Sequence, residues 1–238
     1  MGEERHRGAP IHVIRLNVVV EGDTEWAFAR GLLVEHLLQH GVLCIPMKVV
    51  TSRAGGRTFR GGAVTYGRIR GDVIRCIRGQ PTSECRVTTM FDLYGLPRDF
   101  PGSNDAAKAT DCYQKVQLLE DAFARDIHDW RFMPYLQLHE FEALILTDPL
   151  KFSVFFPDIG RAALELAEMS AGCGAPERID DSPEGAPSKR IARVFPPYAA
   201  AKATAGPRIA EEIGLDTMRA ACPHFDEWVT KLEQLGSG

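Results

Sequence analysis

The stretch Asn17-Val18-Val19-Val20-Glu21-Gly22-Asp23-Thr24-Glu25 joins a strand pattern to a helix pattern through a short turn. Its valines continue an apolar strand pattern that starts near His12, and three valines in succession indicate burial on both faces, as in a parallel sheet. An amphipathic helix pattern follows, which Thr24 can cap and which runs to about His40. Glu21 therefore follows a buried strand, at the carboxyl end, where open α/β sheets bind their ligands.

The same alternation of strand and helix continues along the chain. Strands are predicted at 43–50, 86–92 and 131–138, with helices at 64–77 and 111–128 between them. This order indicates right-handed crossovers and an α/β fold with a mostly parallel sheet and flanking helices. Pro134 favours an edge position for the last strand.

The chain is expected to divide into three parts. Residues 1–10 predict a disordered lead-in, residues 11–147 the α/β core, and residues 148–236 a helical C-terminal region packed on that core. Helices are predicted in this last part at 149–155, 160–171, 188–195, 206–213 and 216–234. Phe225 and Trp228, with Leu232 at helical spacing, are expected in the core.

Composition places the chain among ordinary globular proteins. It has 238 residues, of which 45% are hydrophobic and 25% charged. No apolar run approaches the ~20 residues that a membrane helix needs, and the first ten residues lack the apolar segment of a secretory signal. The six cysteines show neither CxxC pairs nor zinc spacing. We therefore expect a cytoplasmic protein with reduced thiols and no membrane association.

A basic stretch interrupts an otherwise acidic chain. Residues 48–78 carry eight Lys or Arg against one acid, whereas the whole chain has a net charge of −4. Glycines at 55, 56, 61 and 62 free the loop backbone to approach phosphates. We expect this stretch to contact nucleic acid, DNA or RNA, through Arg53, Arg57, Arg60 and Arg68; the alternative is a solvated helix face. Lys189 and Arg190, at a predicted helix start, suit a phosphate or a plain surface helix equally.

Carboxylates follow three of the predicted strands. Glu21 ends the first, Asp92 the third, and Glu140 and Glu142 the fourth. Parallel strands bring their carboxyl ends to one edge of the sheet, so we expect these groups to converge. Such a cluster raises its own pKa values unless a cation neutralises it. Mg²⁺ or Mn²⁺ fits, because hard cations prefer oxygen ligands and can activate water beside a phosphate.

Each acidic residue also has a simpler interpretation. Glu21 can bind helix amides, Asp92 can cap a loop, and Glu25 lies where the helix dipole favours an acid anyway. The segment His139-Glu140-Phe141-Glu142 is no zinc-protease motif, because position 143 is Ala rather than part of HExxH. If the segment is extended, Glu140 and Glu142 share a face; if it is helical, His139 and Glu142 do. We rank Glu140 slightly ahead of Glu142 as a ligand.

Two of these segments resemble the motifs of the Toprim fold, which is found in topoisomerases, primases and OLD-type nucleases. Residues 20–25 look like its glutamate motif, and Phe91-Asp92-Leu93-Tyr94 looks like its Asp-x-Asp motif. Tyr94 stands where the second aspartate would be, so Glu140 or Glu142 is expected to supply the missing ligand. We interpret Tyr94 as packing or as a base-stacking platform.

The whole chain more specifically resembles DUF4276, a bacterial domain family of unknown function related to Toprim. The shared blocks are VEGxTE, DLYGLPxDFPG, HEFEALI, PExI with APSKRI, and CPHFxxW. They stand here at 20–25, 92–102, 139–145, 176–179, 186–191 and 222–228. The resemblance implies a Toprim-like core acting in antiphage defence beside an ABC- or SMC-type ATPase, with a homodimer as a further expectation.

Three functions compete at this point. The leading one is a Mg²⁺- or Mn²⁺-dependent nuclease, with Glu21, Asp92 and Glu140 as catalytic residues and Glu25 and Glu142 as further metal ligands. The second is a non-catalytic Toprim-like sensor or regulatory subunit that docks on an ATPase, which the missing second aspartate favours. A primase-type nucleotidyl transferase ranks lower, because no zinc-binding or helicase-linked module is present.

Overall fold

The computed structural model describes residues 13–49, 65–80, 82–179 and 185–237. Its sheet has the order β2-β1-β3-β4, with β5 also paired to β3, and every pairing is parallel. The predicted α/β class with a mostly parallel sheet is confirmed. The strands are β1 (Ile14–Val20), β2 (Val42–Lys48), β3 (Cys85–Asp92), β4 (Phe132–Met133) and β5 (Leu136–Gln137).

The strand register places the carboxyl ends of the central strands together. Val20 of β1 pairs with Met90 of β3, and Asp92 of β3 pairs with Gln137 of β5. Glu21 therefore emerges one residue beyond Val20, beside Asp92, and the segment after Gln137 emerges on the other side of Asp92. Topology alone thus brings the three predicted acidic segments to one sheet edge.

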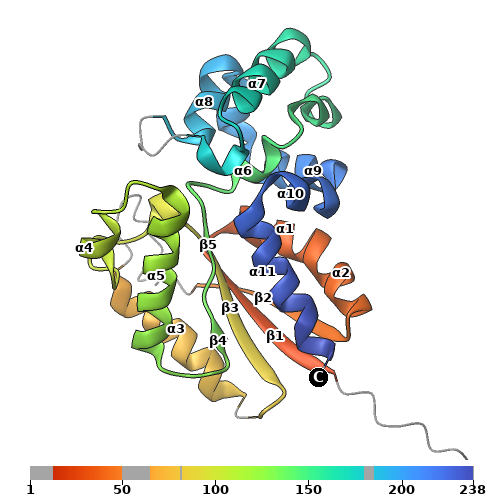
Figure 1. The fold of residues 1–238 in the computed structure, drawn as a ribbon. Coiled ribbons are helices and arrows are strands. Elements are labelled where there is room, and N and C mark those ends of the chain that lie inside the picture. Colours follow the sequence, from red (N-terminus) through yellow and green to blue (C-terminus); the bar gives the residue numbers. More distant parts are fainter. Residues whose placement is uncertain (1–12, 50–64, 81, 180–184, 238) are drawn as a thin grey trace, which may run out of the picture.

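Helices cover both faces of the sheet (Figure 1). One face carries α1 (Asp23–Phe28), a π-helical turn η1 (Ala29–Leu33), α2 (Val34–Gln39) and α11 (Pro223–Gln234). The other carries α3 (Tyr66–Gly79) and α5 (Cys112–Ile127). Alternation along β1 serves both cores: Val18 and Val20 pack in the first, and Val19 in the second. Because helices cover both faces of the sheet, successive valines of β1 are all buried, which explains the unbroken valine run.

The last predicted strand is split in two, and a proline and a side-chain hydrogen bond block further strand pairing at its open edge. Residues 131–138 form two short strands, β4 and β5, separated by Pro134 and Tyr135. Pro134 has no N–H to offer a further strand, and the N–H of Leu136 donates to Oε1 of Glu120 at 2.8 Å. An edge treated in this way resists pairing with another chain. The edge position predicted from Pro134 is confirmed.

Beyond the sheet the chain is helical, as predicted, with two differences. One helix, α9, spans Pro197–Ile213 rather than 206–213, because it continues through Pro207. The predicted helix 216–234 is two helices, α10 (Leu215–Ala221) and α11, which Pro223 separates. Near the N-terminus, Gly22 rather than Thr24 is the N-cap of α1. The remaining elements are η2 (Leu93–Gly95), α4 (Ser103–Ala106), α6 (Glu142–Ile145), η3 (Pro149–Val154), α7 (Gly160–Gly172), η4 (Pro176–Arg178), α8 (Pro187–Val194) and η5 (Leu235–Ser237).

The C-terminal helix α11 returns to the sheet and completes its core. Phe225 and Trp228 are buried in the same cluster as Leu16 and Val18 of β1. The indole ring of Trp228 stacks on Tyr135 at 4.1 Å, and its Nε1 donates to Oγ1 of Thr88 at 2.9 Å. The core position predicted for Phe225, Trp228 and Leu232 is confirmed.

The structure bears on the expected reduced thiols and on the expected lack of membrane helices. The six cysteines are all unpaired thiols. Within the described residues, no helix combines the length and the apolar character needed to cross a bilayer. The predicted disordered lead-in, residues 1–10, lies outside the described residues.

Candidate active site

Glu21 lies at the carboxyl end of β1, against the turn that follows β3. A Cβ added to Gly95 would be 2.7 Å from Oε2 of Glu21 and 3.0 Å from Oε1. Glycine is therefore the residue that lets the carboxylate sit here. The backbone of Asp92 also hydrogen-bonds to the Glu21 carboxylate. The predicted glutamate and aspartate segments are thus in direct contact.

Asp92 is held in place by the segment that follows β5. Its Oδ1 accepts the N–H of Phe141 at 2.9 Å. Burial raises the pKa of Asp92 well above its usual value, and the charges of Glu25, Glu142 and Glu21 raise it further. The other two predicted acidic segments therefore flank the Asp92 carboxylate, which is the convergence that the parallel sheet predicts.

Glu25 points back to the turn that precedes its helix. Its Oε2 accepts the N–H of Gly22 at 2.9 Å, and the side chain is buried. Burial raises the pKa of Glu25, and the neighbouring Glu21 charge adds to the increase. Glu25 therefore caps its helix, which is its simpler interpretation, and also lies beside Glu21; its role as a metal ligand stays a prediction.

Glu142 is fully buried and bound by two side chains of α9. The hydroxyl of Tyr198 donates to its Oε1 at 3.0 Å, and Nζ of Lys202 lies 3.1 Å from Oε1 and 3.2 Å from Oε2. Burial raises the pKa of Glu142, although Lys202 opposes the increase. The side chain of Lys202 remains 39% exposed. Lys202 therefore reaches from solvent into the carboxylate cluster.

Glu140 turns away toward a different helix. Its Oε2 accepts the N–H of Ser188 at 2.9 Å, at the start of α8. Lys189 is exposed and Arg190 half-buried on the same first turn, and Nε of Arg190 donates to the carbonyl of Gly185. One backbone donor of the helix start predicted to bind phosphate is therefore already used by Glu140.

The cluster carries an excess of negative charge. Glu21, Glu25, Asp92 and Glu142 all have raised pKa values, mainly through burial. Among the residues that the structure describes, the charge of Lys202 lowers the pKa of each of the four. The pKa of Lys202 is itself raised, because the attraction of Glu142, Glu140 and Asp92 outweighs its burial. Four carboxylates against one ammonium form a set that a divalent cation would neutralise.

The geometry of the set is open. In the part of the chain that the structure describes, the three metal-type ligand atoms found within 4.8 Å of one another belong to His36, His40 and Glu233, not to these carboxylates. Glu21, Glu25 and Asp92 thus do not form a closed cage. Mg²⁺ is usually held by one or two carboxylates, with waters and substrate phosphates completing its octahedron. An open set of hard oxygen donors fits such an ion.

The predicted basic contacts are only partly within the described residues. Arg53, Arg57 and Arg60 lie outside them. Arg68 is exposed on α3. Two neighbouring arginines of α3 have acidic partners: Arg70 binds Asp126 at 2.7 Å, and Arg75 binds Asp72 at 2.5 Å. The charge of this helix is thus partly compensated within the fold.

A cavity of about 520 Å³ opens beside the aspartate segment. Tyr94 lines it together with two cationic side chains, Arg98 and Lys115. The hydroxyl of Tyr94 hydrogen-bonds to Nδ1 of His139 at 3.0 Å, and Nε2 of His139 lies 2.9 Å from the carbonyl of Glu177. His139, at a positive φ of 61°, therefore fixes Tyr94 in the wall of the cavity.

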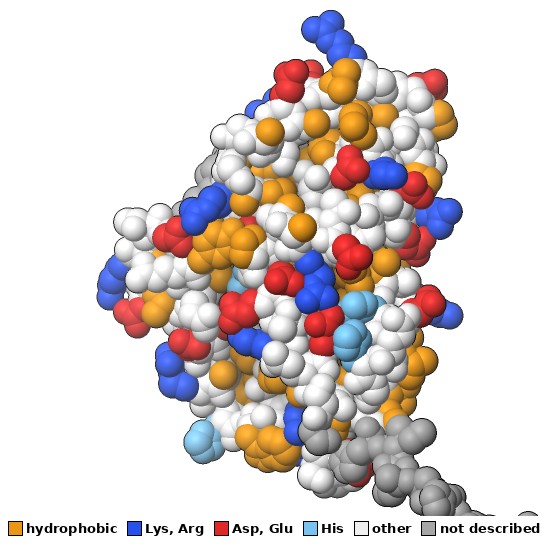
Figure 2. All heavy atoms as spheres, turned by 45° about the vertical axis from the view of Figure 1, so that its right-hand side comes forward, with side chains coloured by type: hydrophobic (Ala, Val, Ile, Leu, Met, Phe, Trp, Pro, Cys, Tyr) orange, Lys and Arg blue, Asp and Glu red, His pale blue; other side chains and the backbone are white. Residues whose placement is uncertain are grey.

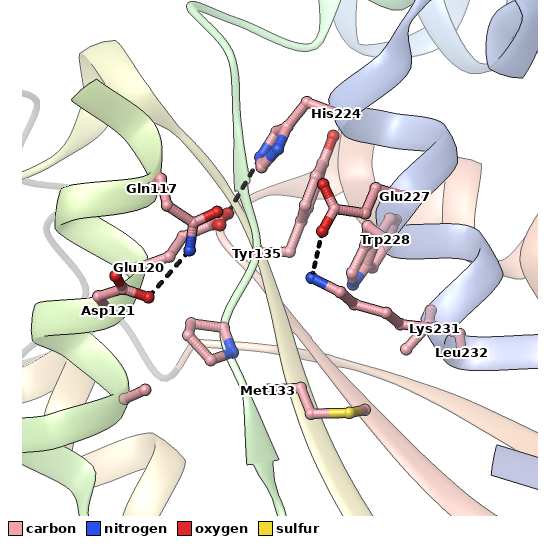
Figure 3. A pocket seen from close by; sticks show the side chains of 12 residues that line it. Gln117, Glu120, Asp121, Met133, Tyr135, His224, Glu227, Trp228, Lys231 and Leu232 are labelled. Carbon is pink, nitrogen blue, oxygen red and sulfur yellow. Dashed lines mark hydrogen bonds and ion pairs between the residues drawn. The ribbon is translucent and has the colours of Figure 1, made fainter. Parts of the chain in front are cut away.

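A second cavity, of about 270 Å³, lies between α5, α11 and the open edge of the sheet (Figure 3). Its polar side chains are bound to one another: His224 to Glu120 at 3.1 Å, Lys231 to Glu227 at 2.7 Å, and Gln117 to Asp121 at 2.9 Å. None of the predicted site residues lines it. We therefore assign the chemistry to the carboxylate cluster.

Sequence reasoning missed the residues that organise the cluster from the C-terminal helices. Lys202 lies in an alanine-rich helix without a recognisable motif, so the sequence pattern does not predict a role for it. Gly206 offered a signal: a Cβ there would be 3.1 Å from the ring of Phe141, so α9 approaches the site closely. Glu177 caps α11, accepting the N–H groups of His224 at 3.1 Å and Phe225 at 3.0 Å.

The chain is similar to a protein family and to solved structures. No curated protein matched the chain. Two solved structures of the C-terminal region of the Xanthomonas campestris pv. campestris OLD protein resemble it, with TM-scores of 0.35 and 0.36 and identities of 17% and 16%. Each alignment covers 92% of this chain, and 97% and 95% of those chains. Residues 20–233 match the family described as Domain of unknown function (DUF4276), and the chain belongs to that family, as its sequence blocks predict.

Proposed function

We propose that this protein is a divalent-metal-dependent, Toprim-like nuclease that hydrolyses phosphodiester bonds of DNA or RNA. One observation carries the proposal: Asp92 lies among Glu21, Glu25 and Glu142, and all four acids have raised pKa values. A fold gains no stability from such repulsion. Pronounced pKa shifts from burial and specific charges are typical of functional sites.

Glu21, Asp92 and Glu25 would hold Mg²⁺ or Mn²⁺ at the sheet edge. Such an ion lowers the pKa of bound water and neutralises charge on a transferring phosphate. Glu142 is bound by Lys202 and Tyr198. Its proposed role is therefore to hold that lysine beside the metal ion, rather than to be a metal ligand itself. Glu140, predicted as a ligand, is bound to α8, and its proposed role is to position that helix.

The chain's own residues supply the proton and phosphate contacts. Glu21 has a pKa raised by burial and reaches solvent, so its carboxylate is a better proton acceptor for attacking water than an ordinary glutamate. The half-exposed ammonium of Lys202 can bind a phosphate oxygen next to the carboxylates. Arg98 and Lys115, in the cavity beside Tyr94, can bind the flanking backbone, with Tyr94 as a surface for a base.

The wider setting of the proposal rests on sequence blocks. Their resemblance to Toprim-related proteins supports an effector that acts in antiphage defence with an ABC- or SMC-type ATPase. It also supports a homodimer of this chain. Arg53, Arg57, Arg60, Arg68, Lys189 and Arg190 remain proposed contacts to nucleic acid, in addition to Arg98 and Lys115.

A second candidate is a non-catalytic sensor or regulatory subunit that docks on an ATPase. Tyr94 favours it, because this side chain stands at the second aspartate position and is already bound to His139. The ammonium of Lys202 also compensates part of the charge that a second ion would otherwise neutralise.

One experiment separates the two candidates. The full chain is incubated with plasmid and with tRNA in Mg²⁺ or Mn²⁺, with and without a candidate ATPase, alongside Glu21→Gln and Asp92→Asn. Glu165→Gln, an exposed residue of α7, is the matched control. We expect cleavage by the wild type and the control and none by the site variants. Cleavage that survives both site substitutions contradicts this site, and an inert chain that binds no metal supports the regulatory subunit.

A further inference from the structure

A second cluster of ligand-type side chains lies away from the carboxylates, between α2 and α11. His36, His40 and Glu233 place one ligand atom each within 4.8 Å of one another. Nε2 of His36 lies 2.6 Å from Oε1 of Glu233, and Nε2 of His40 lies 3.8 Å from the same oxygen. On the face drawn in Figure 2, histidine side chains lie side by side among acidic and basic ones.

The two helices hold these residues in a fixed relation. His36 and His40 are four residues apart, so both imidazoles project from one face of α2 and its end. Their ring centroids are 5.1 Å apart. The chain after α11 packs against the end of α2 so closely that a Cβ on Gly236 would be 1.8 Å from the carbonyl oxygen of His40. Backbone contact thus sets the spacing of the cluster.

Glu233 is oriented by a partner behind it. Arg219 binds Glu233 through Nη1 to Oε1 at 2.5 Å and through Nη2 to Oε2 at 3.3 Å. Arg219 is itself fixed by Asp226 at 2.6 Å and Thr230 at 3.0 Å. Burial alone would raise the pKa of Glu233, but Arg219 and His36 lower it, so the carboxylate stays ionised. Ligating carboxylates in metal sites commonly have such outer hydrogen bonds.

An ordinary ion pair explains only part of this arrangement. His36 and Glu233 suffice for an ion pair, yet His40 is directed at the same oxygen from beyond hydrogen-bond distance. The side chain of His40 is 41% exposed, so packing does not force it there. Two imidazoles converging on one carboxylate from the solvent side are what a metal ion with an open coordination position requires.

We propose that His36, His40 and Glu233 bind one transition-metal ion of the zinc class, which clasps α2 to α11. Two imidazole nitrogens and one carboxylate oxygen suit Zn²⁺ and its substitute Co²⁺, and suit Mg²⁺ poorly. A water molecule completes the tetrahedron. The donor set differs from the oxygen-only cluster around Asp92, so metal preference distinguishes the two sites.

The test uses the full chain, stripped of metal, in an Asp92→Asn background that disables the carboxylate cluster. Zn²⁺ binding is measured by calorimetry, and Co²⁺ binding by the visible absorption of its tetrahedral complexes. We expect one equivalent bound and a higher melting temperature with Zn²⁺. Adding His40→Ala should weaken binding about 10- to 100-fold or more and abolish the melting shift. His128→Asn, at an exposed histidine on α5's C-terminal end, is the matched control and should leave both unchanged.

The outcomes decide the proposal in either direction. Zn²⁺ and Co²⁺ binding that is lost with His40→Ala, while the control retains it, supports the site. Binding that persists in both His40→Ala and His36→Ala overturns it, as does the absence of Zn²⁺ and Co²⁺ binding in a folded protein. Because the Asp92→Asn background is catalytically disabled, the result is independent of the proposed nuclease activity.

Discussion

Asp92 and Glu177 are both carboxylates within the protein, but their surroundings are opposite. Glu177 accepts two backbone N–H groups at the start of α11; burial raises its pKa, while these hydrogen bonds and the charge of His224 oppose the increase. Asp92 accepts one N–H, and three further carboxylates add to the effect of burial. The first arrangement stabilises the fold, and the second opposes it. A carboxylate surrounded by other carboxylates is the one to suspect of chemistry.

Asp92→Asn should give the largest effect and should act on activity rather than on folding. The amide keeps an oxygen for the N–H of Phe141 but loses the charge that would hold a divalent ion. Nuclease activity is expected to fall by about 100-fold or more. Plasmid cleavage in Mn²⁺ measures it, with Glu165→Gln for comparison, and an active Asp92→Asn protein contradicts the contrast with Glu177.

Glu177→Ala should act on the opposite quantity. It leaves two N–H groups at the start of α11 without an acceptor, inside the protein. We expect the free energy of unfolding to fall by about 2–4 kcal/mol, and urea denaturation measures it. Glu177→Gln retains one acceptor oxygen and should lose less. If Glu177→Ala unfolds at the wild-type urea concentration, Glu177 is not the structural member of the comparison.

Much of this contrast can be predicted from the sequence, but only on one side. The Val-rich strand, the parallel alternation and the strand ends bring Glu21 and Asp92 together, because register follows from pattern. Glu177 and Lys202 come from helices whose packing no local pattern specifies. Pro207 also concealed the first half of α9, whose alanines are strong helix formers.

The same limit applies to the other predicted residues. Glu140 and Glu142 both follow the strand end as predicted, but ranking Glu140 ahead was wrong: Glu142 faces Asp92, whereas Glu140 binds α8. The bend at His139, which has a positive φ, separates the two directions. The histidine pair of α2 is readable at i, i+4 spacing. Its carboxylate partner, Glu233, is 197 residues away in sequence and is placed by tertiary packing alone.

Gly95→Ala sharpens the comparison without changing any charge. The added methyl group would collide with the Glu21 carboxylate, which is the mobile end of a flexible side chain and can move aside. Activity is expected to fall about 10-fold, because a catalytic group displaced by about 1 Å is no longer aligned. The free energy of unfolding should change by less than about 0.5 kcal/mol. Gly71→Ala, where a Cβ would meet nothing within 4 Å, is the matched control. Equal kinetics for the two variants would remove Glu21 from the site.

The pH dependence of stability gives a smaller, signed effect. The raised pKa of Asp92 means that the folded protein binds a proton more tightly than the unfolded chain. In EDTA, stability relative to Asp92→Asn should therefore increase as the pH falls from neutral through the folded-state pKa, and level off below the unfolded value of 3.8. Thermal melts of both proteins across this range measure the difference. A wild type that instead loses stability relative to Asp92→Asn over this range contradicts the repulsion.

Mn²⁺ binding, measured as the loss of the free-ion electron paramagnetic resonance signal, tests whether the carboxylate cluster around Asp92 holds a metal ion. It is carried out in a His40→Ala background, so that the histidine–glutamate cluster does not contribute. We predict that Mn²⁺ binds to this protein, that Asp92→Asn and Glu21→Gln weaken the binding about 10-fold or more, and that Glu177→Gln leaves it unchanged. Equal binding by Asp92→Asn and its parent, or no binding by either, contradicts the assignment of a metal site to the carboxylate cluster.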